Sequence, residues 1–376
     1  MPRRCPVTGR NSAIMSEPGE ESPATFVKRF PFLDWMRGLA VVIMIQCHTF
    51  NSFVRLDLRD GGPYVYSQFV GGMAAPLFLF MAGMTTGFQM ESLARREPSP
   101  LRRWLVSLKR AGYILGIAFL FRFTNYLGSL PGGSLQEITK VDILNCMAVG
   151  LALFAAAALF DSANRVRFAL LTALAIAAAT PPMAQLPWEG VPRLFREYLV
   201  PLSGRGQFAF FPCASYVGFG LAAGVLVKRA PEEGFERLML WSGLGGLVLV
   251  YAAQYLSNLP FSLYSQTSFW TDNPALILIR VGVILAIMAG AYVWTAYCAG
   301  AGWSWMQCLG KNSLMVYWVH VMMVYGSLVK PIKRTMAIPA AAAATLLVTA
   351  LMLALSAAWL RWKARRREVA KTAVAA

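Results

Sequence analysis

An apolar segment near the start of the chain contains three ionisable side chains, Asp34, Arg37 and His48. The step of eleven residues from Arg37 to His48 is close to three helical turns, so we expect both side chains on one face. Asp34 precedes Arg37 by one turn on that face. At ~1.5 Å per residue, the cation and the imidazole lie about 16 Å apart along the axis. Because imidazole can act as a general base near neutral pH, this stripe suits a site that holds an anion at one end and removes a proton at the other.

A purely structural interpretation is open for each of these residues. Asp34 and Arg37 can form an i,i+3 ion pair at a helix start, with the Arg37 side chain extended towards lipid headgroups. His48 can be a hydrogen-bonded residue of the core. Its alignment with Arg37 on one helix face favours a catalytic role for His48.

Other polar residues occur in the fourth and eighth apolar segments. Asp142 and Asn145 are one turn apart and can bind a sugar hydroxyl, although Asp142 is equally suited to cap the helix. Arg280 is an embedded cation. It can balance Asp142 or Asp272 across helices, or it can hold an anionic ligand. We take Asp142, Asn145 and Arg280 as candidate substrate-binding residues.

The ninth apolar segment begins with a sequence suited to a helix start, in which free N–H groups and Lys311 can receive an anion. Tyr317 and His320 follow, three residues apart on one face. His320 is the only histidine besides His48, and an acid–base role and a packing role are equally open for it. Tyr317 and His320 complete the candidate substrate-binding set.

The composition indicates that membrane-spanning helices position these residues. Of the 376 residues, 57% are hydrophobic and only 14% are charged, whereas soluble domains contain about 25% charged residues. A spanning helix needs about 20 mostly apolar residues. The sequence therefore predicts an all-α, polytopic membrane protein with ten spans, with eleven as the alternative. The ten predicted spans are residues 31–54, 65–90, 104–124, 141–160, 166–183, 207–227, 238–257, 274–298, 304–325 and 337–360.

The basic residues predict the orientation and account for the net charge of +17. With the N-terminus inside, the inner segments hold more than twice as many lysines and arginines as the outer loops, and we assign only Arg37 and Arg280 to spans. Cytoplasmic loops carry this excess, so both termini are predicted on the cytoplasmic side of an inner (plasma) membrane. The positive charge then faces anionic lipid, and no nucleic-acid partner is expected. The candidate residues for the anionic end of a co-substrate are Arg37, Arg102, Arg103, Lys109, Arg110 and Lys311.

The chain divides into a polar tail at 1–30, a transmembrane domain at 31–360 and a basic tail at 361–376. The N-terminal tail at 1–30 has no apolar core of a signal peptide, and Met15 offers an alternative start of the chain. The longest outer loop, 180–206, can form an interfacial helix or a lid.

Small residues and Pro76 in the second span predict close helix contacts and a kink. The six cysteines and two histidines have no metal-site spacing, so no metal is expected.

The first span resembles the signature of the membrane acyltransferase-3 superfamily, an arginine and a histidine separated by ten residues. Other segments look more like the heparan-α-glucosaminide N-acetyltransferase-like branch of that superfamily. These segments are Asp34-Trp-Met-Arg37-Gly38-Leu-Ala, the Ala-Pro-Leu-Phe-Leu-Phe-Met-Ala-Gly of the second span and Val-Asp142-Ile-Leu-Asn145. The segment from Gly310 to His320 is similar to the C-terminal motif of the same superfamily.

This resemblance implies a membrane enzyme of ten or eleven helices. Such an enzyme takes an acyl group, with acetyl as the first choice, from cytosolic acyl-CoA. It passes the group to a carbohydrate or envelope acceptor on the outer side. The resemblance assigns Arg37 to the CoA end and His48 as the base towards the acceptor hydroxyl or amine.

The chain departs from the branch at one position. In the heparan-α-glucosaminide N-acetyltransferases proper, an asparagine aligns with His48 and the implicated histidine lies in the following loop. Here that loop, 51–66, contains no histidine. The acceptor of that enzyme therefore is not transferred to this chain, and the acyltransferase-3 pattern fits better.

The alternative function is a non-enzymatic transporter of an anionic lipid, sugar or metabolite, in which the embedded charges would be transport sites. Transporters often contain inverted repeats, and this sequence shows none, which favours the enzyme. The acyl group, the acceptor, transfer to oxygen or nitrogen, and the oligomeric state are not specified by the sequence.

Overall fold

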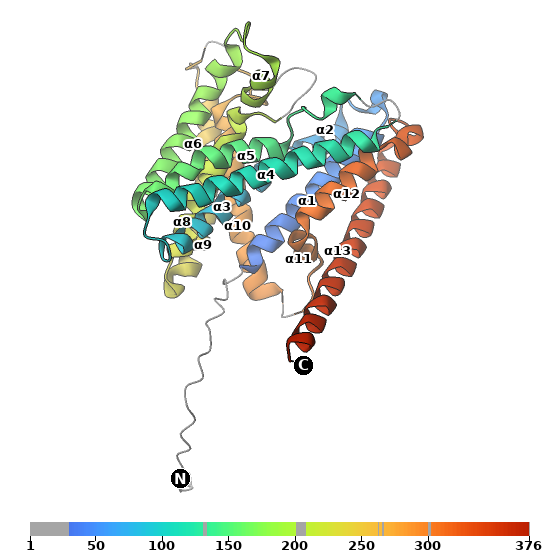
Figure 1. The fold of residues 1–376 in the computed structure, drawn as a ribbon. Helices are drawn as coiled ribbons and strands as arrows, with labels where there is room; N and C mark the ends of the chain where they lie inside the picture. The colour runs from blue at the N-terminus through green and yellow to red at the C-terminus, as the bar shows by residue number, and fades with distance from the viewer. Residues whose placement is uncertain are drawn as a thin grey trace, which may run out of the picture. The chain divides into compact units, whose positions relative to one another are not determined.

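The computed structural model describes residues 30–130, 134–200, 208–261, 263–264, 267–299 and 302–375, so the tail at 1–29 lies outside the described residues. Residues 31–376 form one compact unit. Within the described ranges the regular elements are all helical, apart from an isolated bridge between Val54 and Met336. The α-helices (Figure 1) are α1 (Pro31–Phe53), α2 (Gly62–Gly71), α3 (Ala74–Ala94), α4 (Pro100–Gly128), α5 (Ile143–Phe154), α6 (Ser162–Gln185), α7 (Arg193–Leu199), α8 (Phe210–Arg229), α9 (Glu232–Ser257), α10 (Pro274–Val293), α11 (Trp305–Lys311), α12 (Ser313–Tyr325) and α13 (Ile338–Ala375).

Each of the ten predicted spans corresponds to helix in the described part of the chain. Seven helical segments there are long and apolar enough to cross a membrane: 62–94, 100–128, 162–185, 210–229, 232–257, 274–298 and 338–370. The apolar helices at 143–159 and 313–325 are shorter, and the 23-residue α1 carries Asp34 and Arg37. The chain therefore has the architecture of a multi-pass membrane protein, whereas the count of ten and the orientation stay predictions.

The second predicted span is interrupted, as its composition indicated. Helix α2 ends at Gly71 and α3 begins at Ala74. Pro76 lies in the first turn of α3, where it lacks the N–H that would bond to the carbonyl of Gly72. The helix is therefore interrupted one turn before the proline, near the position where a kink is expected.

Glycines let α3 and α8 approach until their backbones are in contact. A Cβ atom on Gly83 would overlap the carbonyl oxygen of Val217, and one on Gly220 would overlap that of Phe80. The pattern repeats one turn further along both helices. Close approach of this kind replaces the hydrophobic effect as the source of helix association within a bilayer.

A second close approach holds α1 against α11. A Cβ atom on Gly38 would overlap the carbonyl oxygen of Met306, and one on Gly310 would overlap that of Asp34. Figure 1 shows α1 beside α11 and α12. Because Arg37 lies between Asp34 and Gly38, this contact fixes the backbone that carries it.

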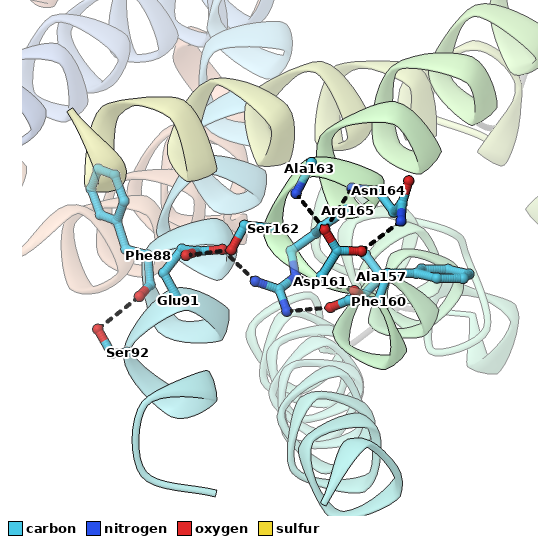
Figure 2. Close-up of polar contacts among 10 residues, drawn as sticks. All are labelled: Phe88, Glu91, Ser92, Ala157, Phe160, Asp161, Ser162, Ala163, Asn164 and Arg165. Atoms are coloured by element: carbon cyan, nitrogen blue, oxygen red, sulfur yellow. Dashed lines mark hydrogen bonds and ion pairs between the residues drawn. The ribbon is translucent and has the colours of Figure 1, made fainter. Parts of the chain in front are cut away.

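A closed ionic cluster joins α3 to the start of α6 (Figure 2). The guanidinium of Arg165, which is only 1% exposed, pairs with Glu91 and donates to the carbonyl oxygens of Ala157 (3.1 Å) and Phe160 (2.8 Å). The Ser162 hydroxyl donates to the second oxygen of Glu91 at 3.0 Å. Every charged group in the cluster therefore has several partners, and its geometry suits a structural role. The sequence analysis did not single it out.

Candidate active site

The two histidines of the chain meet between α1 and α12. Nδ1 of His48 lies 3.0 Å from Nε2 of His320. The rings are nearly coplanar, with 12° between their planes and 5.2 Å between their centres. Nδ1 of His320 lies 2.6 Å from the carbonyl oxygen of Val316, one turn earlier in α12. The residues predicted separately as a base and as a second acid or base therefore form one hydrogen-bonded pair.

The backbone carbonyl determines which ring nitrogen is the base. A carbonyl oxygen only accepts, so Nδ1 of His320 carries a proton, and the neutral ring then offers its lone pair at Nε2. Nδ1–H of His48 donates to that lone pair, which leaves the lone pair of His48 at Nε2. His320 is fully buried, whereas His48 keeps partial exposure. The pair thus presents Nε2 of His48 as its accessible base.

Aromatic and amide side chains surround the exposed edge of this pair. The ring of Tyr325 lies edge-on to His48, with 5.4 Å between centres, and its hydroxyl accepts a hydrogen bond from the Asn51 amide at 3.3 Å. Both residues are exposed at the ends of their helices. This end of the site is therefore open to a polar ligand.

A carboxylate network lies beside the histidines. The Tyr317 hydroxyl donates to Asp142 at 2.7 Å, and the Arg122 guanidinium pairs with the same carboxylate oxygen at 3.3 Å. Asp142 also caps α5, forming a capping box with Asn145. The capping role expected for Asp142 is therefore confirmed, and its ionic partner is Arg122 and not Arg280.

Part of the predicted 180–206 loop reaches this network. The Asn145 amide donates to the Tyr198 hydroxyl of α7 at 3.0 Å. Burial raises the pKa of the Tyr198 hydroxyl, which therefore stays protonated. The interfacial-helix prediction falls on α7, and residues 201–206 of this loop lie outside the described residues.

A largely apolar cavity of about 230 Å³ lies below the histidines, between α1, α3, α4, α5 and α12. Its lining along α1 runs from Arg37 to Met44, one turn before His48. Along α12 it runs to Tyr317, one turn before His320. Other lining residues are Phe78, Ile114, Ile117, Leu144 and Met147. The cavity therefore has a cationic end at the arginines, and its lining on α1 and α12 ends one helical turn before the two histidines.

Two arginines converge at the cationic end. Arg37 and Arg110 both line the cavity and act on each other electrostatically. Arg110 donates to Gln89, and Arg37 lies 3.4 Å from Asp34. The predicted Asp34–Arg37 ion pair is thus present, yet Arg37 also faces the cavity.

The comparison with known families fits this arrangement. The profile of the acyltransferase-3 family, described as an acyltransferase domain, matches residues 30–357, nearly the whole compact unit. The chain belongs to the acyltransferase-3 family. No curated protein shows significant similarity to it. Membership confirms the resemblance at the level of the superfamily and makes the chain a membrane acyltransferase, whereas the likeness to one branch stays a prediction.

Not every basic residue predicted for the co-substrate lines the cavity of this acyltransferase. Arg102 and Lys109 are exposed on α4, and Arg102 pairs with Glu97 at 3.8 Å. Lys311 is exposed at the end of α11. Arg103 is half-buried and acts electrostatically on Arg165 of the closed cluster. Only Arg37 and Arg110 of the predicted set reach the cavity.

The structure corrects the inventory of embedded cations. Sequence analysis assigned only Arg37 and Arg280 to spans, but Arg122 lies six residues before the end of α4, with a side chain only 14% exposed. It falls inside the predicted span 104–124, so the rule that flagged Arg37 would have found it. In the count of basic residues that predicts the orientation, Arg122 is included with the following loop.

Proposed function

We propose that this acyltransferase transfers an acyl group, acetyl in the first instance, from cytosolic acyl-CoA to a hydroxyl or amine of a carbohydrate or envelope acceptor on the opposite side of the membrane. The observation that carries the proposal is the cavity between the Arg37–Arg110 pair and the His48–His320 pair. Arg37 and Arg110 line the cavity, and its lining on α1 and α12 ends one helical turn before His48 and His320, which supports a donor that lies between the two pairs.

The donor's chemistry matches this passage. Acyl-CoA carries phosphates at one end and a long thin thioester arm at the other. Charge-assisted hydrogen bonds from Arg37 and Arg110 suit the phosphates. The apolar lining formed by residues such as Met44 and Ile117 suits the arm, and the thioester then reaches the level of His48.

The reaction needs one proton transfer in each direction. Nε2 of His48 takes the proton of the acceptor O–H or N–H as that atom attacks the thioester carbonyl. The tetrahedral intermediate collapses, the C–S bond breaks, and the leaving thiolate takes the proton back from His48 as CoA–SH. The acceptor carries the new ester or amide bond.

Two further residues position the reacting groups. His320 accepts from Nδ1–H of His48 and stabilises the imidazolium that forms at Nε2. Tyr317 gives its one hydroxyl proton to Asp142, so it shapes the cavity next to His320 without donating to the substrate.

Binding of acyl-CoA tests the proposal without knowledge of the acceptor. Thermal shift of detergent-purified protein is measured with acetyl-, succinyl- and longer-chain CoA for wild type, Arg37→Ala, Arg110→Ala and His48→Ala. Lys109→Ala is the matched control, because it removes a cation next to Arg110 that does not line the cavity.

We expect saturable stabilisation that Arg37→Ala and Arg110→Ala weaken about 10- to 100-fold, as for a lost hydrogen bond to a charged group. His48→Ala and Lys109→Ala should retain it. Absence of any shift in folded wild-type protein would reject acyl-CoA as donor and favour the transporter.

A further inference from the structure

Arg280 has no ionic partner in the part of the chain that the structure describes. Both acidic residues that the sequence offered as partners are engaged elsewhere. Asp142 pairs with Arg122 at 3.3 Å, and Asp272 accepts the backbone N–H of Ser268 at 2.7 Å. Of the three interpretations of Arg280 from the sequence, only binding of an anionic ligand is left.

The connecting segments outside the described residues cannot supply a counter-charge on this side either. The connections at 131–133, 201–207, 262 and 265–266 contain no aspartate or glutamate. The charge of Arg280 therefore awaits a partner from outside these loops.

A second polar group without a partner lies next to Arg280. Tyr216 of α8 is only 1% exposed, and its hydroxyl forms no hydrogen bond with a described residue. Arg280 lies close to the Tyr216 hydroxyl and acts on it, and also acts electrostatically on Cys213 one turn earlier, although no well-aligned hydrogen bond joins Arg280 to the hydroxyl. A buried hydroxyl without a partner is rare and needs an explanation. A shared ligand would satisfy both groups.

This pair lies beside the histidine site. A Cβ atom on Gly72 would be 3.3 Å from Nη2 of Arg280, and one on the preceding Gly71 would overlap the Cys47 side chain, which adjoins His48. Gly71 and Gly72, between α2 and α3, therefore lie between Arg280 and the turn of α1 that carries Cys47 and His48.

The same groups lie at similar distances from the ends of their own helices. His48 lies five residues before the end of α1, and Tyr216 and Arg280 lie six residues after the starts of α8 and α10. At ~1.5 Å per residue, each is about 8–9 Å from the corresponding helix end.

We propose that Arg280 and Tyr216 form a subsite that binds a carboxylate or phosphate group of the acceptor, so that the acyltransferase acts on an acidic acceptor. The planar guanidinium matches the two oxygens of either group, and the Tyr216 hydroxyl donates a third hydrogen bond. The role in the acceptor rests on the proposed function, whereas the anion site itself does not.

The test titrates purified protein in detergent with glucuronate, glycerol 1-phosphate and the neutral methyl glucoside, read by thermal shift. Wild type should be stabilised saturably by at least one of the anions and not by the neutral sugar. Arg280→Gln should weaken this binding about 10- to 100-fold, and Tyr216→Phe by less. Arg280→Lys, which keeps the charge but loses the fork, should fall between wild type and Arg280→Gln. The control Lys330→Gln removes an exposed cation and should bind as wild type does.

Two results would overturn the subsite: no saturable response of wild type to either anion, or equal responses of wild type and Arg280→Gln. An equal loss in Lys330→Gln would also overturn it, because bulk charge would then explain the effect. Selectivity for glucuronate or for glycerol 1-phosphate identifies the acidic group. Acyl-CoA binding in the same preparations separates the two proposals, because its absence alongside anion binding would reject the donor and not the subsite.

Discussion

Two polar regions of this acyltransferase differ in how completely their groups are satisfied. In the closed cluster, Arg165 has a carboxylate and two carbonyl partners, and Glu91 is held by Arg165 and Ser162 (Figure 2). In the histidine pair, every ring nitrogen except Nε2 of His48 is engaged. Every charged group of the cluster is thus paired within the protein, whereas the histidine pair keeps one lone pair, at Nε2 of the partly exposed His48.

Whether a polar group has partners within the protein distinguishes structural residues from candidate site residues better than its charge or burial does. Arg165 is more buried than Arg37 and would rank higher by the cost of embedding a charge alone. Its partners remove it as a candidate. Arg37, by contrast, pairs with Asp34 and also lines a cavity together with a second cation, Arg110, so the two guanidinium groups are available to an anionic ligand.

The largest effect is expected at the unsatisfied nitrogen. His48→Ala removes the base and should lower acyl transfer about 10²–10⁴-fold, the usual contribution of general base catalysis. The measurement is release of free CoA from the bound thioester by membranes that carry the native acceptor. Acyl-CoA binding should stay close to wild type, because His48 lies beyond the cavity lining. Undiminished turnover would remove His48 from the mechanism.

The closed cluster should respond in the opposite way. Glu91→Ala leaves the Arg165 cation buried without its carboxylate and should lower the free energy of unfolding by about 3–5 kcal/mol. Glu97→Ala is the matched control, because its partner Arg102 is 76% exposed and such pairs contribute about 0.2–1 kcal/mol. Detergent-solubilised protein, unfolded by heat or denaturant, measures both. Equal stability of the two variants would contradict a structural role for the cluster.

Local sequence patterns predicted the helices and the alignment of Arg37 with His48. Apolar segments gave all ten helical regions, and the eleven-residue step placed Arg37 and His48 on one face because both depend only on neighbours along the chain. The contact between His48 and His320 joins residues 272 positions apart, so no periodicity contains it.

The residues that the sequence patterns missed have two different causes. Arg122 was assigned to a loop because the count of basic residues followed loop charge and not the limits of the span. Glu91 and Arg165 lie near helix ends, where sequence rules expect solvent, and only the packing of α3 against the neighbouring helices buries them. Burial of a helix end depends on tertiary structure, which a single sequence does not specify.

The smallest effect is expected at His320. Like Arg165, it is fully buried and hydrogen-bonded within the protein, but its partner is His48, the proposed base. His320→Phe keeps the ring volume and removes the lone pair that receives Nδ1–H of His48. The lost hydrogen bond is worth about 1–3 kcal/mol, so transfer should fall about 5- to 150-fold, less than in His48→Ala.

Because His320 orients the base, the pH dependence of kcat should change while acyl-CoA binding does not. A packing role alone would lower stability and leave the pH profile as in wild type. His320→Asn, whose amide oxygen can still accept, should recover part of the activity, and no recovery together with an unchanged pH profile would assign His320 to the core.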